Sequence, residues 1–79
     1  MAEKYTRDDL INHAKSPGWE LVIGQDQKPV TGTLEDVAKA AHDRHKAGHG
    51  MGLIRRIENA VELEMLQIEA LWQHLGLPM

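Results

Sequence analysis

The chain is 79 residues long, a length that fits one small domain, and it contains 0 cysteines, so disulfide bonds and thiolate zinc sites are excluded. The formal net charge is −3, from 9 Lys+Arg against 12 Asp+Glu, which is the wrong sign for a protein that binds a phosphate backbone. Apolar runs are short, as in Leu21–Ile23, and the first residues lack the apolar stretch of a secretory signal. We therefore expect a cytoplasmic protein with no nucleic-acid partner and no membrane partner.

The first predicted element is a helix at about residues 7–15. Thr6 can cap its amino end, and Asp8 and Asp9 follow in the first turn, where the helix dipole favours negative charge. Pro17 ends the pattern because proline disfavours a helical conformation in the residue before it.

A β-hairpin is predicted at about residues 19–32. Trp19, Leu21 and Ile23 recur at every second position, which is the spacing of a strand. After a polar turn, Pro29 suits the start or the edge of a returning strand. Two strands alone are marginal in water, so the hairpin must pack on helices or extend a sheet in a partner chain. Residues 1–5 are a candidate for a further strand.

A second helix is predicted at about residues 34–47. Thr33 is followed by two acidic residues, which is a capping signal, and Gly48 suits the carboxyl-terminal cap. One face of this helix carries small and apolar residues together with one histidine: Leu34, Val37, Ala38, Ala41 and His45.

The longest predicted element is a helix at about residues 53–75, where apolar residues recur with helical spacing. Its broad apolar side is predicted to be buried, with Ile57, Val61, Ile68 and Trp72 in the core. At 1.5 Å per residue this helix would be roughly 35 Å long, against roughly 30 Å for a globule of this size.

The opposite side of the same predicted helix carries a second, smaller apolar strip formed by Leu63, Leu66 and Ala70. This strip needs a cover, and a two-fold contact with a second copy provides one. We therefore predict a homodimer with these three residues at the interface. The alternative is that the first helix covers the strip within one chain.

Glu64 and His45 form the predicted buried polar pair. Glu64 falls within the broad apolar side of the long helix, and His45 falls among the alanines of the preceding helix. A buried unpaired carboxylate is costly, so the two side chains are expected to meet and to fix the register of the helices. An acid/base pair or a pair of metal ligands is the alternative interpretation.

The segment HDRHKAGHGMG, residues 42–52, is the most unusual part of the chain. On a continuous helix, His42, His45 and His49 would share one side and could bind Zn²⁺ or Ni²⁺. The glycines around His49 instead favour a helix end and a hinge, which leaves His42 and His49 solvated and His45 partly buried. The glycine-rich loop could also offer backbone amides to an anion, but it matches neither phosphate-binding pattern.

Catalytic chemistry is not indicated. Ser16 is the single serine and precedes a proline in a connector, and the carboxylates otherwise decorate helix faces. No catalytic residue and no cofactor is predicted.

The stretch GLIRRIENAVELE, residues 52–64, resembles the carboxyl-terminal helix of small phage anti-CRISPR proteins that inhibit a type I-F complex. The resemblance implies an origin in a phage or mobile element, and no residue roles are carried over from it. The sequence as a whole predicts a small single α+β domain over residues 1–79, ordered α-β-β-α-α. The predicted function is that of a non-enzymatic protein-interaction or regulatory protein acting through the long helix and the hairpin. The alternative is a histidine-based metal-binding protein or metallochaperone that uses His42, His45 and His49.

Overall fold

The computed structural model describes residues 5–24, 27–50 and 52–78. The helices and strands within them are α1 (Arg7–Asn12), β1 (Trp19–Val22), β2 (Val30–Gly32), α2 (Leu34–Lys46), β3 (Leu53–Arg56) and α3 (Met65–His74). The domain is α+β, as predicted, and measures 30 × 28 × 20 Å. Its order is α-β-β-α-β-α, with a strand where the sequence predicted the first part of the long helix. Of the candidate strand at residues 1–5, residues 1–4 lie outside the described residues, and Tyr5 is buried but not in a strand.

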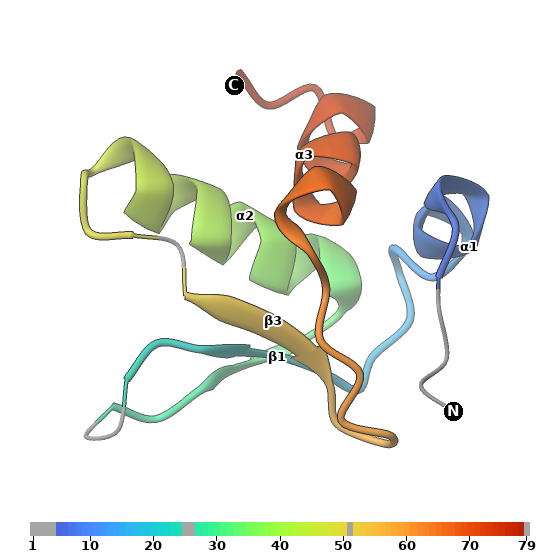
Figure 1. The fold of residues 1–79 in the computed structure, drawn as a ribbon, viewed down its shortest axis with the longest axis horizontal. Coiled ribbons are helices and arrows are strands. Elements are labelled where there is room, and N and C mark those ends of the chain that lie inside the picture. The colour runs from blue at the N-terminus through green and yellow to red at the C-terminus, as the bar shows by residue number, and fades with distance from the viewer. Residues whose placement is uncertain (1–4, 25–26, 51, 79) are drawn as a thin grey trace.

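The sheet is antiparallel with the strand order β2-β1-β3, and α2 and α3 lie over one of its faces (Figure 1). The helix α2 crosses all three strands, while α1 packs beside α3. This arrangement solves the problem of the marginal two-stranded hairpin within one chain, because β3 supplies a third strand and α2 a cover.

The helix α1 begins at the predicted cap but ends earlier than predicted. The backbone N–H of Thr6 donates to Asp9 at 3.0 Å, and Asp9 N–H donates to the Thr6 hydroxyl at 3.1 Å. The hydrogen bond from the Thr6 backbone, together with the Thr6 side chain, lowers the pKa of the Asp9 carboxyl. Beyond Asn12 the chain turns, and the carbonyls of residues 14 and 16 accept hydrogen bonds from the first turn of α2 instead of continuing the helix.

The predicted hairpin is confirmed. In the antiparallel pair of β1 and β2, Trp19 lies opposite Gly32 and Leu21 opposite Val30. Burial along β1 alternates, with Trp19 and Leu21 fully buried and the residues after each of them half-buried. The apolar residues at alternate positions of the sequence therefore correspond to the side of β1 that faces the core.

The helix α2 also matches its prediction, from the capping box at Thr33 and Asp36 to its carboxyl end. Gly48 adopts a positive φ of 81°, its N–H donates to the His45 carbonyl, and the next N–H donates to the Arg44 carbonyl. This pair of hydrogen bonds is the Schellman arrangement that glycine favours after a helix.

The predicted long helix at residues 53–75 is wrong. Residues Leu53–Arg56 form β3, which pairs with β1 so that Ile54 lies opposite Leu21. The chain then reverses, and the returning segment bonds to the free edge of β3, with Arg56 N–H to Val61 O and Leu63 N–H to Ile54 O, both at 2.9 Å. Only Met65–His74 is helical. The stretch that resembles an anti-CRISPR helix is therefore a strand and a turn in this chain.

Two local features mark where the long helix is interrupted. At the turn after β3, the Asn59 side chain accepts a hydrogen bond from Val61 N–H at 3.1 Å, and Ala60 has a positive φ of 57°. Asparagine favours such turns because its side chain can bond to nearby backbone. At the start of α3, the N–H of Glu64 donates to the Gln67 side chain at 2.7 Å, so Glu64 is a capping residue and not a mid-helix residue.

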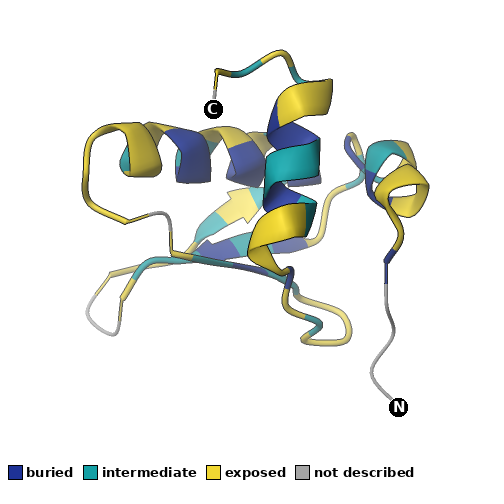
Figure 2. Ribbon diagram, turned by 45° about the horizontal axis from the view of Figure 1, so that its top comes forward, coloured by how far each residue is buried: buried dark blue, intermediate teal, exposed yellow. Residues whose placement is uncertain are grey.

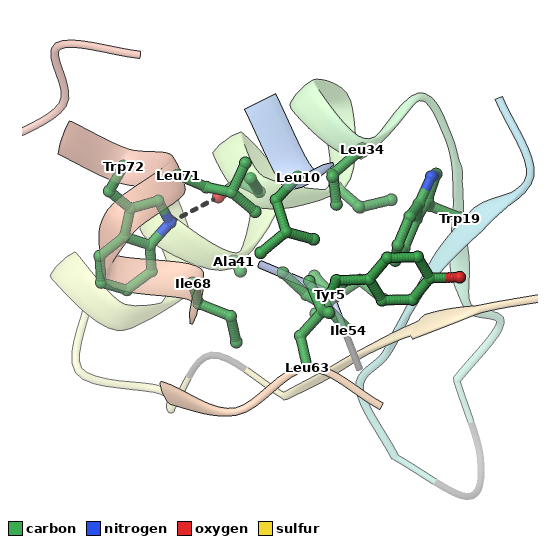
Figure 3. Close-up of a cluster of buried hydrophobic side chains, with 13 residues drawn as sticks. Tyr5, Leu10, Trp19, Leu34, Ala41, Ile54, Leu63, Ile68, Leu71 and Trp72 are labelled. Carbon is green, nitrogen blue, oxygen red and sulfur yellow. Dashed lines mark hydrogen bonds between the residues drawn. The ribbon is translucent and has the colours of Figure 1, made fainter. Parts of the chain in front are cut away.

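The core fills the space between the sheet and the helices, as Figure 2 shows by the buried residues where α2, α3 and the sheet meet. Trp19 and Trp72 are its largest fully buried side chains, and they sit at opposite ends of the cluster drawn in Figure 3. Of the four predicted core residues, Ile68 and Trp72 are buried and Val61 is half-buried, but Ile57 is 52% exposed. Ile57 is exposed because it occupies the turn after β3.

Candidate functional site

The histidines of residues 42–49 are placed differently from the prediction. His42 is buried, at 6% exposure, whereas His45 and His49 are exposed. The prediction had His42 solvated and His45 partly buried, so the roles of these two residues in α2 are reversed.

His42 holds the end of the chain against α2. Its Nε2–H donates to the carbonyl oxygen of Pro78, a residue that follows α3. Its ring also meets the Trp72 ring edge-on, with centroids 5.2 Å apart and an interplanar angle of 83°. A buried imidazole needs such a polar partner, and here the partner comes from the far end of the sequence.

His45 lies on the same tryptophan. Its ring is tilted by 33° to that of Trp72, with centroids 5.4 Å apart. Trp72 is itself held by α2, because its indole N–H donates to the Ala38 carbonyl at 2.9 Å (Figure 3). The two histidines of α2 therefore border one rigid aromatic ring.

The predicted buried pair of His45 and Glu64 is not part of this arrangement. Both residues are exposed, and Glu64 caps the opposite end of α3 from the one that His45 approaches. The pair does not form because Glu64 is not in the middle of a long helix. It lies at the start of α3, where its carboxylate is exposed to water and needs no buried partner.

A small cavity lies beside these histidines. It is lined by His42, His45, Lys46 and Pro78 and has a volume of about 250 Å³. His42, His45 and Lys46 follow the spacing i, i+3, i+4, which brings their side chains to one side of a helix. The cavity is thus bordered by two imidazoles and one ammonium group, a combination suited to negatively charged ligands.

His49 does not join the other two. It follows the glycine that ends α2, and it is exposed. Among the residues that the structure describes, no group of three or more metal-ligating side chains comes together. His42 Nε2 is also engaged by a carbonyl, so the spacing of the histidines alone overstated their ability to share an ion.

The glycine-rich loop leads into a strand, not into a helix. Gly50 and Gly52 have positive φ values of 75° and 80°, and a Cβ at Gly52 would lie 2.6 Å from the Val22 carbonyl oxygen. A helix start after this loop would favour anion binding through its backbone amides, but the strand β3 follows the loop instead. Gly52 permits the close approach of β3 to β1.

The three predicted interface residues are separated by the fold. Leu63 is buried at 5% exposure in the chain's own core, Ala70 is half-buried, and Leu66 is 76% exposed. Leu66 and Ala70 remain on one side of α3 at the spacing i, i+4, next to Met65 at 40% exposure.

One cluster was not anticipated from the sequence. The Tyr5 hydroxyl accepts hydrogen bonds from Arg56 at 2.6 Å and from Asn59 at 3.0 Å, and the Arg56 guanidinium lies 5.7 Å from the centres of the Tyr5 and Trp19 rings. Gln67 donates to the Tyr5 carbonyl at 2.8 Å. These contacts tie the start of the chain to β3 and α3. The sequence shows only a tyrosine just before the first helix cap. The residues that donate these hydrogen bonds to it are more than 50 positions away, so a sequence pattern does not connect them.

In comparisons with known proteins, no family model, no curated protein and no solved structure matches the chain. Within the described residues, no helix has the length and apolar character needed to cross a membrane.

Proposed function

We propose that this chain is a small non-enzymatic protein-interaction or regulatory protein that works in the cytoplasm as a homodimer. The proposed interface is the outer side of α3 with Leu66 at its centre. The supporting observation is the 76% exposure of Leu66, next to Met65 at 40%, on the first turn of a helix whose other side is buried.

The choice of a second copy as the occupant follows from size and geometry. A chain of 79 residues without cysteine gains stability from association, which covers apolar side chains that one copy leaves in water. In a two-fold contact the same side chain meets its own copy, so a single exposed leucine provides apolar surface to both partners. The half-buried Ala70 allows the second helix to approach closely on the same side.

The hairpin, expected to share in binding, contributes less than α3 to this proposal. On the strand residues opposite those in the core, Glu20 and Arg55 face each other and form an ion pair at 2.6 Å. This ion pair places charge on the outer face of the sheet, and we assign the interface to α3.

Two polar residues have structural roles. The Asp9 carboxyl, whose pKa is lowered, is exposed and accepts the Thr6 N–H in the capping box of α1. The carbonyl of Ser16 accepts the N–H of Leu34 at 3.2 Å and joins the α1–β1 connection to the start of α2. Both residues therefore have a structural explanation.

Sedimentation equilibrium tests the proposal, with Leu66→Glu as the variant. A dimer of the 8.9 kDa chain is expected at micromolar concentration. Burying an unpaired glutamate costs several kcal/mol, so the variant should weaken self-association by roughly a hundredfold or more. Ile57→Glu is the matched control, because Ile57 is also apolar and exposed at 52% but lies outside α3. A wild-type chain that stays monomeric at high concentration would refute the proposal, as would equal losses for both variants.

A further inference from the structure

The cavity at the carboxyl end of α2 has a composition that the proposed dimer does not use. Its described lining residues, His42, His45, Lys46 and Pro78, include no carboxylate. Lysine carries a positive charge at neutral pH, and histidine in general gains one between about pH 8 and pH 5. From this geometry we propose that the cavity binds a small oxyanion, the carboxylate or phosphate group of a small ligand.

The size of the cavity sets the size of the ligand. Pockets for drug-sized molecules typically measure about 300 to 1,000 Å³, and this one measures about 250 Å³. A single anionic group with its nearest waters fits such a volume. The Pro78 ring supplies an apolar wall, and the Trp72 ring, which both histidines border, holds their imidazoles in place.

The donors available to an anion can be named. His45 and Lys46 are exposed, so their nitrogen atoms can reach a ligand without losing an existing buried contact. His42 uses Nε2–H for the Pro78 carbonyl, so its Nδ1 carries a proton only when the ring is cationic. Lys46 and His45 are therefore the expected principal donors.

The surroundings of the cavity decide whether the net field favours an anion. The carboxyl end of a helix carries about half a negative charge. At α2 this effect is reduced, because the N–H groups of Gly48 and His49 bond to the carbonyls of the last turn. From α2 itself, Arg44 is half-buried and cationic and Asp43 is exposed and anionic, and from α3 the exposed His74 lies in the last turn. Arg44 and Asp43 carry opposite charges, so the positive charge of Lys46 exceeds the half negative charge of the helix end.

Binding should consequently strengthen as the pH falls. Sulfate and acetate are the probes, because neither changes its charge between about pH 8 and pH 6, where histidine in general does. Sulfate represents a phosphate group and acetate a carboxylate, so the two titrations distinguish the sources of the anion. At constant ionic strength, the proton NMR signals of the imidazole rings report on each histidine separately.

The expected result is a saturable shift of the His42 and His45 signals that is tighter at about pH 6 than at about pH 8. His13, which packs on Tyr5 and Trp19 instead, is the internal control and should not shift. Lys46→Met should weaken binding roughly tenfold, because a hydrogen bond to a charged group is worth about 1.5 kcal/mol or more. Lys39→Met is the matched variant: it removes an exposed lysine of the same helix, which pairs with Glu35 outside the cavity, and should leave binding unchanged.

Three outcomes would overturn the proposal. The first is no saturable shift with either anion at the lower pH. The second is an equal shift at all histidines, which indicates screening of charge and not a site. The third is equal weakening by both lysine variants. None of these outcomes depends on the dimer, since the lining residues of the cavity lie outside the proposed interface and the titrations can be repeated on Leu66→Glu.

Discussion

Replacing Ile54 and Ile57 by alanine, one at a time, separates the observed strand from the helix that the sequence suggested. The two residues have the same side chain and lie close together in the sequence. In the structure Ile54 is fully buried in β3 opposite Leu21, whereas Ile57 is 52% exposed in the following turn. A long helix would bury Ile57 as well as Ile54. The two substitutions should therefore differ strongly in their effect on the free energy of unfolding.

The size of each loss can be estimated from burial. Isoleucine to alanine removes three carbon atoms, worth about 2.5 kcal/mol when all are buried. The closed cavity left behind at Ile54 adds about 1 kcal/mol, which gives a total of about 3 to 4 kcal/mol. At Ile57 about half of the transfer term applies and no closed cavity forms, so the loss should be about 1 kcal/mol or less.

Equilibrium unfolding in urea measures both values. A chain of this length is expected to have a total stability of about 4 to 12 kcal/mol, so Ile54→Ala leaves a folded population in most of that range. If it does not fold, Ile54→Val, at about 1 kcal/mol, keeps the comparison measurable. Equal losses at the two positions, or a larger loss at Ile57, would refute the placement of β3.

Two further predictions concern the end of α2 and the loop after it. Gly52→Ala should destabilise the fold by clearly more than Gly50→Ala. Both glycines have a positive φ, but only at Gly52 would the new Cβ meet a strand carbonyl at 2.6 Å. Thermal melts of the two variants measure the difference. Similar melting temperatures for the two variants would contradict the close approach of the strands. His42→Gln should lose about 1 to 3 kcal/mol, because it disturbs a buried hydrogen bond and an aromatic contact, whereas His45→Gln at an exposed position should lose about 0.5 kcal/mol or less. The same urea titration checks this order, and a reversed order would restore the placement expected from the sequence alone.

Features specified by neighbouring residues could be predicted from the sequence. The caps at Thr6 and Thr33 each place a hydroxyl three residues before an acid, and both capping boxes form. Gly48 ends α2 by a local backbone motif. The first strand of the hairpin could be predicted because large apolar residues recur at every second position of β1, where the buried positions lie. Each of these depends on contacts within a few residues, which a sequence pattern contains.

The strand β3 could not be predicted in the same way, because its apolar residues fit two periods. Leu53, Ile54, Ile57 and Val61 match a helical stripe, yet Ile54 also serves as the inward residue of a short strand. What decides between the two is non-local. The strand β1 has hydrogen-bonding groups on both edges, β2 satisfies one edge, and β3 satisfies the other. Tertiary pairing of this kind overrides helix propensity, which differs by less than about 1 kcal/mol per residue among most residue types.

The exchange of His42 and His45 shows the same limit within a correctly predicted helix. Helical spacing places His45 on the apolar face of α2 and His42 at the edge of that face, so the pattern ranks their burial in the wrong order. Their burial is decided by Trp72, which both rings touch, and by Pro78, whose carbonyl His42 binds across a separation of 36 positions. The tail can return over His42 because α3 ends at His74, close to the predicted helix end. The reversal at the histidines therefore depends on non-local contacts, as the correction at β3 does, and a variant that moved the end of α3 would change the exposure of His42 without any substitution in α2.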